Sequence, residues 1–232
     1  MTLDSDLSYD RYRLVDADEW LMRIGSPALI PLLFLPPLFE EMNRTRAFLA
    51  AIMRRLAAQG FGCWLPDLPG TGESERALEE CRWEDWRSAA ASAAWHVRTV
   101  TGRAAVLICF RGGALLDDIE APGHWRFAPA EGASLARDLV RSSLVATAEQ
   151  PGEAMELAGY RLRPDLLRDL EAADVRPAAP LRTVRLQSDR GEADLKVPGP
   201  ALWRRSEPGN APDLAERLST DIVAWIGQCG VS

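Results

Sequence analysis

The amino-acid sequence predicts an α/β fold in which helices cover both faces of a mostly parallel sheet. Three segments, residues 28–35, 61–65 and 104–109, have the nearly continuous hydrophobicity of strands that are buried on both faces. Amphipathic helical patterns over residues 43–59 and 83–99 separate these segments, and the connections are short. Such alternation predicts right-handed crossovers between parallel strands. We therefore expect the three segments to be neighbouring parallel strands inside one sheet.

The remaining elements follow from weaker patterns. The first helix is expected to begin at Asn43, a good N-cap residue, and to end at Gly60. The other predicted elements are a short helix over residues 114–119, a strand over 124–127, a helix over 131–143, a helix after Pro164, a strand over 181–187, a short edge strand within 187–211 and a closing helix over 212–228. The active sites of open parallel sheets lie beyond the carboxyl ends of the strands, so the loops found there matter most for function.

Length and composition narrow the class of protein. The 232 residues suit one domain spanning positions 1–232, and 47% hydrophobic residues can build a large core. The formal net charge of -7 disfavours a nucleic-acid partner, because an acidic surface repels phosphates. The N-terminal residues lack the basic and apolar regions of a signal peptide, and the apolar run over residues 28–38 is too short to span a bilayer. We expect a cytoplasmic protein that does not span a membrane.

The four cysteines are far apart, without the paired spacing of a zinc or redox site. Two of them, Cys63 and Cys109, fall in predicted buried strands, where a cysteine acts as a small apolar filler. Reduced thiols are therefore expected. The sequence predicts neither a metal site nor a cofactor.

A tight turn follows the strand over residues 104–109 and resembles a nucleophile elbow. An elbow needs small residues two positions before and two positions after the nucleophile, and here these are Cys109 and Gly113, with Gly112 between the tip and Gly113. Arg111 then occupies the nucleophile's position, and a protonated guanidinium cannot attack a carbonyl. The alternative is an ordinary turn between a strand and a helix, carrying a surface arginine.

The loops before this turn favour the elbow. The segment DLPGTGES at residues 67–74 resembles the D-x-P-G-x-G-x-S segment of α/β-hydrolases, one crossover before the elbow. The two prolines at 36–37 resemble the oxyanion loop of the same fold. The resemblance implies an α/β-hydrolase-like sheet, and we expect the cap above it to be reduced.

Longer segments resemble a narrower group, the hydrolase 2 proteins associated with exosortase A systems in bacteria that make exopolysaccharide. These segments are PPLFEEMNRTR at 36–46, RGGALL at 111–116, ELAGYRL at 156–162 and VPGPALW at 197–203, so the resemblance extends from about residue 30 to the C-terminus. It implies that an arginine at the elbow is usual in the group. It also implies a role linked to exopolysaccharide.

The other members of a catalytic triad are not recognisable, and we assign no catalytic residue. The loop before the last helix should hold a histidine, but residues 187–211 contain none. His96 falls inside a predicted helix, and His124 lies nearer the presumed site, with no Ser or Cys predicted beside it. Cys109 is a substitute nucleophile or, as is commoner, inert filler. Ser74 is expected to stabilise its turn.

Arg111 needs a carboxylate if it is buried at the positive end of a helix. Glu40 and Glu41 lie on the loop expected to face it, after Leu38, and an internal salt bridge is one reading. The other is that Arg111 holds the carboxylate or phosphate of a ligand.

Trp125 and Trp203 either form walls of the same pocket or belong to the core. The leading hypothesis is a non-catalytic binding or accessory protein in exopolysaccharide biosynthesis or export, with a small anionic or acyl ligand or a protein partner. The alternatives are an active ester or thioester hydrolase, using an unconventional nucleophile such as Cys109 or water, and a purely structural subunit.

Overall fold

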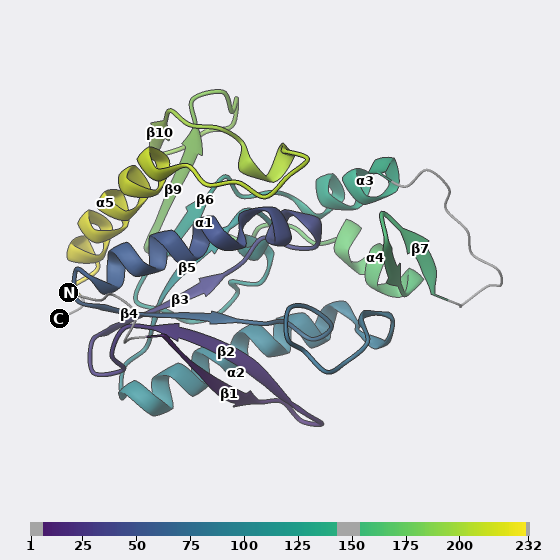
Figure 1. Ribbon diagram of the computed structural model, residues 1–232, viewed down its shortest axis with the longest axis horizontal. Helices are drawn as coiled ribbons and strands as arrows, with labels where there is room; N and C mark the ends of the chain where they lie inside the picture. Colours follow the sequence, from purple (N-terminus) through teal and green to yellow (C-terminus); the bar gives the residue numbers. More distant parts are fainter. Residues whose placement is uncertain (1–6, 143–153, 231–232) are drawn as a thin grey trace.

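Figure 1 shows the computed structural model, which describes residues 7–142 and 154–230. Its main sheet contains the strands β1 Leu7–Arg13, β2 Asp18–Ile24, β3 Ile30–Leu35, β4 Phe61–Pro66, β5 Val106–Phe110, β6 His124–Phe127, β9 Leu181–Leu186 and β10 Leu195–Val197. Their order across the sheet is β1-β2-β4-β3-β5-β6-β9-β10. All neighbours from β4 to β10 are parallel, and this confirms the predicted mostly parallel sheet.

The three apolar segments are neighbouring interior strands, as expected. In β3, Leu32 pairs with Cys63 of β4 on one side and with Val106 of β5 on the other. Successive residues of β3 face opposite layers of the core, because the side chains of a strand alternate between its faces. Leu33 and Leu35 therefore pack in the core layer on one side of the sheet, and the side chains on both sides are buried.

Helices cover both faces of the sheet (Figure 1). On one face, α1 Glu40–Ala57 packs beside α5 Pro212–Gln228, and both contribute to one layer of the core. On the other face lies α2 Trp83–Thr101, from which Trp83, Trp86 and three alanines join the second layer. The closing helix has the predicted bounds, because apolar residues at helical spacing follow Pro212 at its first turn.

A small cap lies beyond the carboxyl ends of the strands (Figure 1). It contains α3 Gly132–Ser142, the antiparallel hairpin of β7 Met155–Leu157 and β8 Tyr160–Leu162, and α4 Pro164–Glu171. Ser143, the last residue of the predicted helix over 131–143, lies outside the described residues, as do residues 1–6.

Two predicted boundaries were wrong. The first helix begins at Glu40 rather than Asn43, and Asn43 lies inside it. Phe39 is the N-cap residue, with a φ of 55°, and its side chain makes no capping hydrogen bond. The helix predicted over residues 114–119 is instead a 3-10 turn, η2, over Arg111–Leu115. Two further 3-10 turns are η1 Leu78–Glu80 and η3 Leu202–Arg204.

The N-terminal hairpin was not predicted. β1 pairs with β2 antiparallel, and β2 pairs antiparallel with β4, which extends the sheet on that side. β1 is an edge strand with mostly exposed or half-buried side chains, so it lacks a continuous apolar signal. Within residues 7–142 and 154–230, no helix combines the length and hydrophobicity needed to cross a membrane.

Gly113 offers a test of the packing at the elbow. A Cβ added at Gly113 would collide with the backbone oxygen of Leu35, which the sheet holds in place. Gly113→Ala should therefore lower the free energy of unfolding by about 1–3 kcal/mol or more, as overpacking does. In the control variant Gly227→Ala, a Cβ meets no atom within 4 Å in the interior of α5, and stability should rise by about 0.5–1 kcal/mol. Urea denaturation measures both, and equal effects of the two substitutions would contradict the packing.

Candidate functional site

Arg111 stands at the tip of a sharp turn at the end of β5. Its φ is 53°, a left-handed conformation that residues other than glycine adopt rarely, and the turn leads directly into η2. This is the backbone shape of a nucleophile elbow. The side chain of Arg111 is only 12% exposed, so the alternative of an ordinary turn with a surface arginine is wrong.

The residues that flank the tip have no room for larger side chains. A Cβ at Gly112 would come within 2.7 Å of Leu135 Cδ1 and 2.9 Å of Leu38 Cγ. Gly113 lies against the end of β3, and Cys109 is fully buried two residues before the tip. Leu38 therefore packs directly on the elbow, from the loop between β3 and α1.

A bidentate ion pair ties Arg111 to Glu41. The Nη2 and Nε atoms of Arg111 donate to the two carboxylate oxygens of Glu41 at 2.9 and 3.1 Å, and Nη1 donates to the carbonyl of Ala128 at 3.0 Å. The guanidinium carbon also lies 4.5 Å from the centre of the Trp203 ring. Glu41 is 15% exposed, so both charges are largely removed from water.

The two adjacent glutamates have different partners. Burial raises the pKa of Glu41, and the neighbouring Arg111 opposes that rise. Glu40 instead lies 3.4 Å from Arg44 and accepts a hydrogen bond from the hydroxyl of Tyr160 at 3.2 Å. Of the two carboxylates expected to face Arg111, Glu41 is the one that neutralises it.

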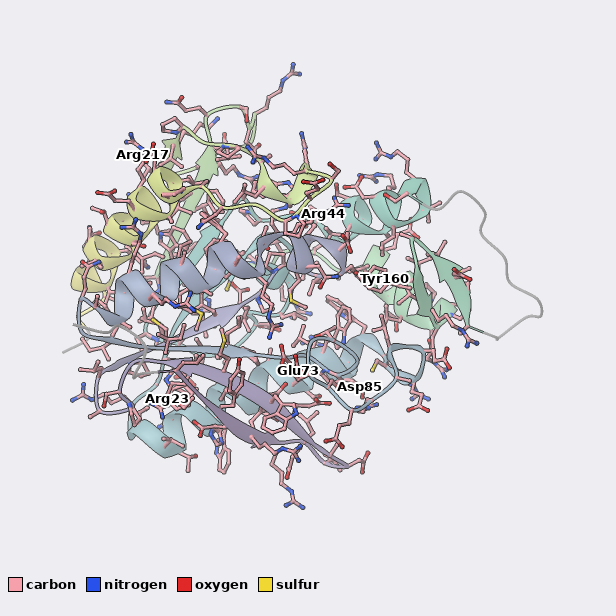
Figure 2. All side chains as sticks on the ribbon, in the orientation of Figure 1. Arg23, Arg44, Glu73, Asp85, Tyr160 and Arg217 are labelled. Atoms are coloured by element: carbon pink, nitrogen blue, oxygen red, sulfur yellow. The ribbon has the colours of Figure 1, made fainter. Side chains whose placement is uncertain are left out.

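Segments far apart in the sequence meet at this point. The amide of Asn43 donates to the hydroxyl of Tyr160 at 3.1 Å, and Arg44 donates to the carbonyl of Trp203 at 3.0 Å. Figure 2 shows Arg44 and Tyr160 at the same end of α1. Burial, together with the charge of Glu40, raises the pKa of Tyr160 to about 12, so its hydroxyl remains a donor. The loop after β3, the cap hairpin and η3 are therefore joined around the elbow.

Of the other two triad positions, the loop of the acid holds an aspartate and the loop of the histidine holds a tryptophan. In this type of fold the acid and then the histidine follow the nucleophile along the chain, on loops at the same edge of the sheet. The loop after β9 holds Asp189, which sequence reasoning missed; it accepts hydrogen bonds from Arg185 at 2.9 Å and from the backbone of Gly191 at 2.8 Å. The segment after β10 places Trp203, not a histidine, against Arg111.

His124 pairs in the sheet with Leu107, four residues before the elbow tip. It begins β6, and its Nδ1 lies 3.5 Å from the carboxylate of Asp117. Burial alone would raise the pKa of Asp117, but contacts with His124 and Arg126 outweigh it and lower the pKa. Arg126 donates to Asp117 at 2.7 Å. Asp117, His124 and Arg126 therefore form a buried cluster of polar and charged side chains.

Cys109 belongs to the same buried cluster. Its sulfur lies 3.5 Å from the carboxylate of Asp117. Burial, and then the negative charge of Asp117, raise the pKa of the Cys109 thiol well above its ordinary value. The thiol is therefore protonated and out of contact with solvent. The other histidine, His96, lies on α2 with its ring against Trp64.

Trp125 does not form a wall of the site, and that alternative was wrong. It is fully buried, its Nε1 donates to Asp221 of α5 at 2.8 Å, and its ring stacks near Phe127. Trp203 does line the site. Ser74 stabilises its turn, because its hydroxyl accepts from the backbone of Gly70 at 2.9 Å and donates to Glu19 at 3.0 Å.

A cavity of about 900 Å³ lies over Glu41, between the start of α1, α3, the turn of the cap hairpin and η3. Arg111 is not among its lining residues, because Glu41 stands between the guanidinium and the cavity. The apolar lining residues are Leu38, Phe39, Leu135, Leu139, Ala158 and Trp203; the charged ones are Glu40, Glu41, Arg44, Asp138, Arg141 and Arg204. No group of residues in the described part of the chain has a composition that could hold a metal ion.

Comparisons with known proteins identify the fold. No family model matches the chain, and no curated protein matches it. Solved structures do. Est1E from Butyrivibrio proteoclasticus has a TM-score of 0.64 at 13% identity, over 96% of this chain and 100% of its own.

Two further structures have the same TM-score of 0.59. Mouse alpha/beta hydrolase domain-containing protein 10 is 13% identical over 95% of this chain and 99% of its own. A serine hydrolase without a lid, from Xanthomonas campestris, is 11% identical over 95% of both chains. With this sheet order, this elbow and these neighbours, the chain has the α/β-hydrolase fold.

Proposed function

We propose that this protein is a non-catalytic member of the α/β-hydrolase fold that binds a ligand in the cavity beside the elbow. The observation that carries the proposal is the bidentate Arg111–Glu41 pair at the position of the nucleophile. Arg111 stays protonated and cannot attack a substrate, and each of its three nitrogens already donates a hydrogen bond to Glu41 or to the carbonyl of Ala128. The ion pair fills the space where acyl chemistry takes place in an active member of the fold.

Acyl transfer needs an activated nucleophile and a base that can reach it. Trp203 stands at the position of the histidine, and an indole cannot accept a proton from a nucleophile. Cys109 is fully buried with a raised pKa, and its polar neighbour, Asp117, is engaged by Arg126. These features argue against the alternative of an ester or thioester hydrolase that uses Cys109 or water.

The wider role that we propose is that of an accessory protein in exopolysaccharide biosynthesis or export. This part rests on the resemblance to the exosortase-associated group. It is supported by the way in which the resembling segments converge: the loop at 36–46, the elbow, the cap hairpin and the segment ending at Trp203 all contribute to one site.

The first test is of activity. Purified protein should hydrolyse short-chain p-nitrophenyl esters no faster than the Arg111→Met variant, and a fluorophosphonate probe should label neither protein. Iodoacetamide should alkylate the half-buried Cys229 in the native protein and reach Cys109 only after denaturation in urea. Mass spectrometry of the digested protein identifies the peptides that the fluorophosphonate or the iodoacetamide has labelled. Burst kinetics, or labelling of Cys109 in the native state, would identify an active nucleophile and refute the proposal.

The second test is of the ion pair. Arg111→Met leaves Glu41 buried without its partner and should lower the free energy of unfolding by about 3–5 kcal/mol. This corresponds to a fall of roughly 10 °C in Tm. The double variant Arg111→Met, Glu41→Leu should be less destabilised than the sum of the single variants. As a control, Arg141→Ala breaks an ion pair with Asp138 whose side chains are 75% and 52% exposed, and it should cost less than about 1 kcal/mol. Additive effects at 111 and 41 would show that the pair is not formed.

The third test uses pH. Without Arg111, the burial that raises the pKa of Glu41 is unopposed, so the folded variant binds a proton that the unfolded chain releases. Stability from such a group is present at low pH and is lost as pH rises through the folded-state pKa. The deficit of Arg111→Met relative to wild type should therefore be smaller at pH 5 than at pH 8. Chemical denaturation at the two values measures it, and a deficit that grows toward pH 5 would contradict the assignment.

A further inference from the structure

The cavity over Glu41 has two unlike walls. Leu135 and Leu139 of α3, with Leu38 from the loop before α1, form an apolar side. The other side is polar and consists of Glu40, Glu41 and Arg44 of α1 with the η3 residues Trp203 and Arg204. A ligand with an apolar part and a polar part would match this division.

The carboxylates of the lining are already neutralised. Glu41 is paired with Arg111. Glu40 lies beside Arg44, and Asp138 lies 2.7 Å from Arg141. Each negative charge on the lining therefore has a guanidinium of the protein beside it, which leaves little attraction for a cationic ligand.

On the wall formed by α1 and η3, the two carboxylates of Glu40 and Glu41 lie among three arginines: Arg44 and Arg204 on the lining and Arg111 behind Glu41. Among the described residues, the buried Nε1 of Trp203 has no hydrogen-bond acceptor, and the Nε of Arg44 has only the carboxylate of Glu40 at 3.4 Å. The exposed side chain of Arg204, on the same wall, has no ion-pair partner among the described residues. Buried donors without acceptors are costly, and guanidinium groups bind carboxylate and phosphate oxygens best.

We propose that the cavity binds a single-chain amphiphile with an anionic head, either a carboxylate or a phosphate. The head lies at Arg44 and Arg204, and the apolar chain lies along Leu38, Leu135 and Leu139. The volume of about 900 Å³ falls within the range of small-molecule sites. This inference rests on the proposed function, because it takes the cavity beside the elbow as the binding site. It adds the chemical class of the ligand and its orientation.

Isothermal titration calorimetry on the full chain tests the class of ligand. The probes are decanoate, decyl phosphate, decanol, acetate and inorganic phosphate, each kept below its critical micelle concentration. Decanoate or decyl phosphate should bind with a stoichiometry of one, and whichever binds tighter identifies the head group. Decanol should bind at least about tenfold more weakly, since it lacks the charge that the arginines recognise. Acetate and inorganic phosphate, which lack the chain, should show no saturable binding at the same concentrations.

Variants test the orientation. Arg204→Ala should weaken binding of the tighter anionic probe by roughly threefold to tenfold and leave decanol unchanged, because Arg204 contacts only the head. Arg217→Ala is the matched control: Arg217 is an exposed arginine on α5, away from Arg44 (Figure 2), and its loss should change nothing. Ser134→Trp places an indole in the cavity from α3 and should abolish binding of every probe. Thermal melts of each variant establish that it is folded.

The outcomes separate this inference from the proposed function. Equal affinity for decanol and decanoate, absence of binding by both anionic amphiphiles, or insensitivity to both Arg204→Ala and Ser134→Trp would overturn the amphiphile site. None of these outcomes touches the non-catalytic assignment. Turnover of p-nitrophenyl decanoate that Arg111→Met abolishes would instead refute the proposed function.

Discussion

The buried guanidinium of Arg111, at the carboxyl end of a central strand, needs a carboxylate to neutralise it. Much of the arrangement of the site follows from this requirement. The elbow forces Arg111 into a left-handed conformation and turns its side chain away from solvent. Glu41 answers it from the first turn of α1, where the positive end of the helix also favours a negative charge. The ion pair therefore fixes the start of α1 relative to β5, and with it the positions of the residues on either side of Glu41. Glu40 meets Arg44 and Tyr160, while Leu38 packs on Gly112.

The cap is held to the start of α1 by its own contacts. Tyr160 joins the hairpin of β7 and β8 to the N-terminal turn of α1, and its neighbour Arg161 lies 2.9 Å from Glu79 of η1. Leu157 and Leu162 are buried below the hairpin, so polar contacts and apolar packing hold it in one position. The cavity thus lies among elements whose contacts converge on the start of α1.

The sequence predicted the centre of the fold better than its edges. Strands β3, β4 and β5 are buried on both faces, so their apolar runs are easily recognised, whereas β1 exposes much of its surface and carries no such run. The start of α1 was misplaced because Phe39 caps it by backbone conformation alone. Asn43 looked like a cap, but its amide contacts Tyr160, 117 residues away. The position of Trp125 depends in the same way on Asp221, 96 residues away. Which of Glu40 and Glu41 pairs with Arg111 depends on the direction in which each side chain leaves α1, and this could not be predicted because the start of the helix was misplaced.

The ion pair at the elbow also limits how such a chain could evolve. A change of Arg111 to serine would restore a hydroxyl at the tip but leave Glu41 buried and unpaired, so the intermediate would be less stable than either end point. A functioning base would further require a histidine in place of Trp203, whose ring also packs against Phe127. A single substitution at Arg111 or at Glu41 is therefore expected to be selected against for its loss of stability, because each leaves the other charge buried without a partner.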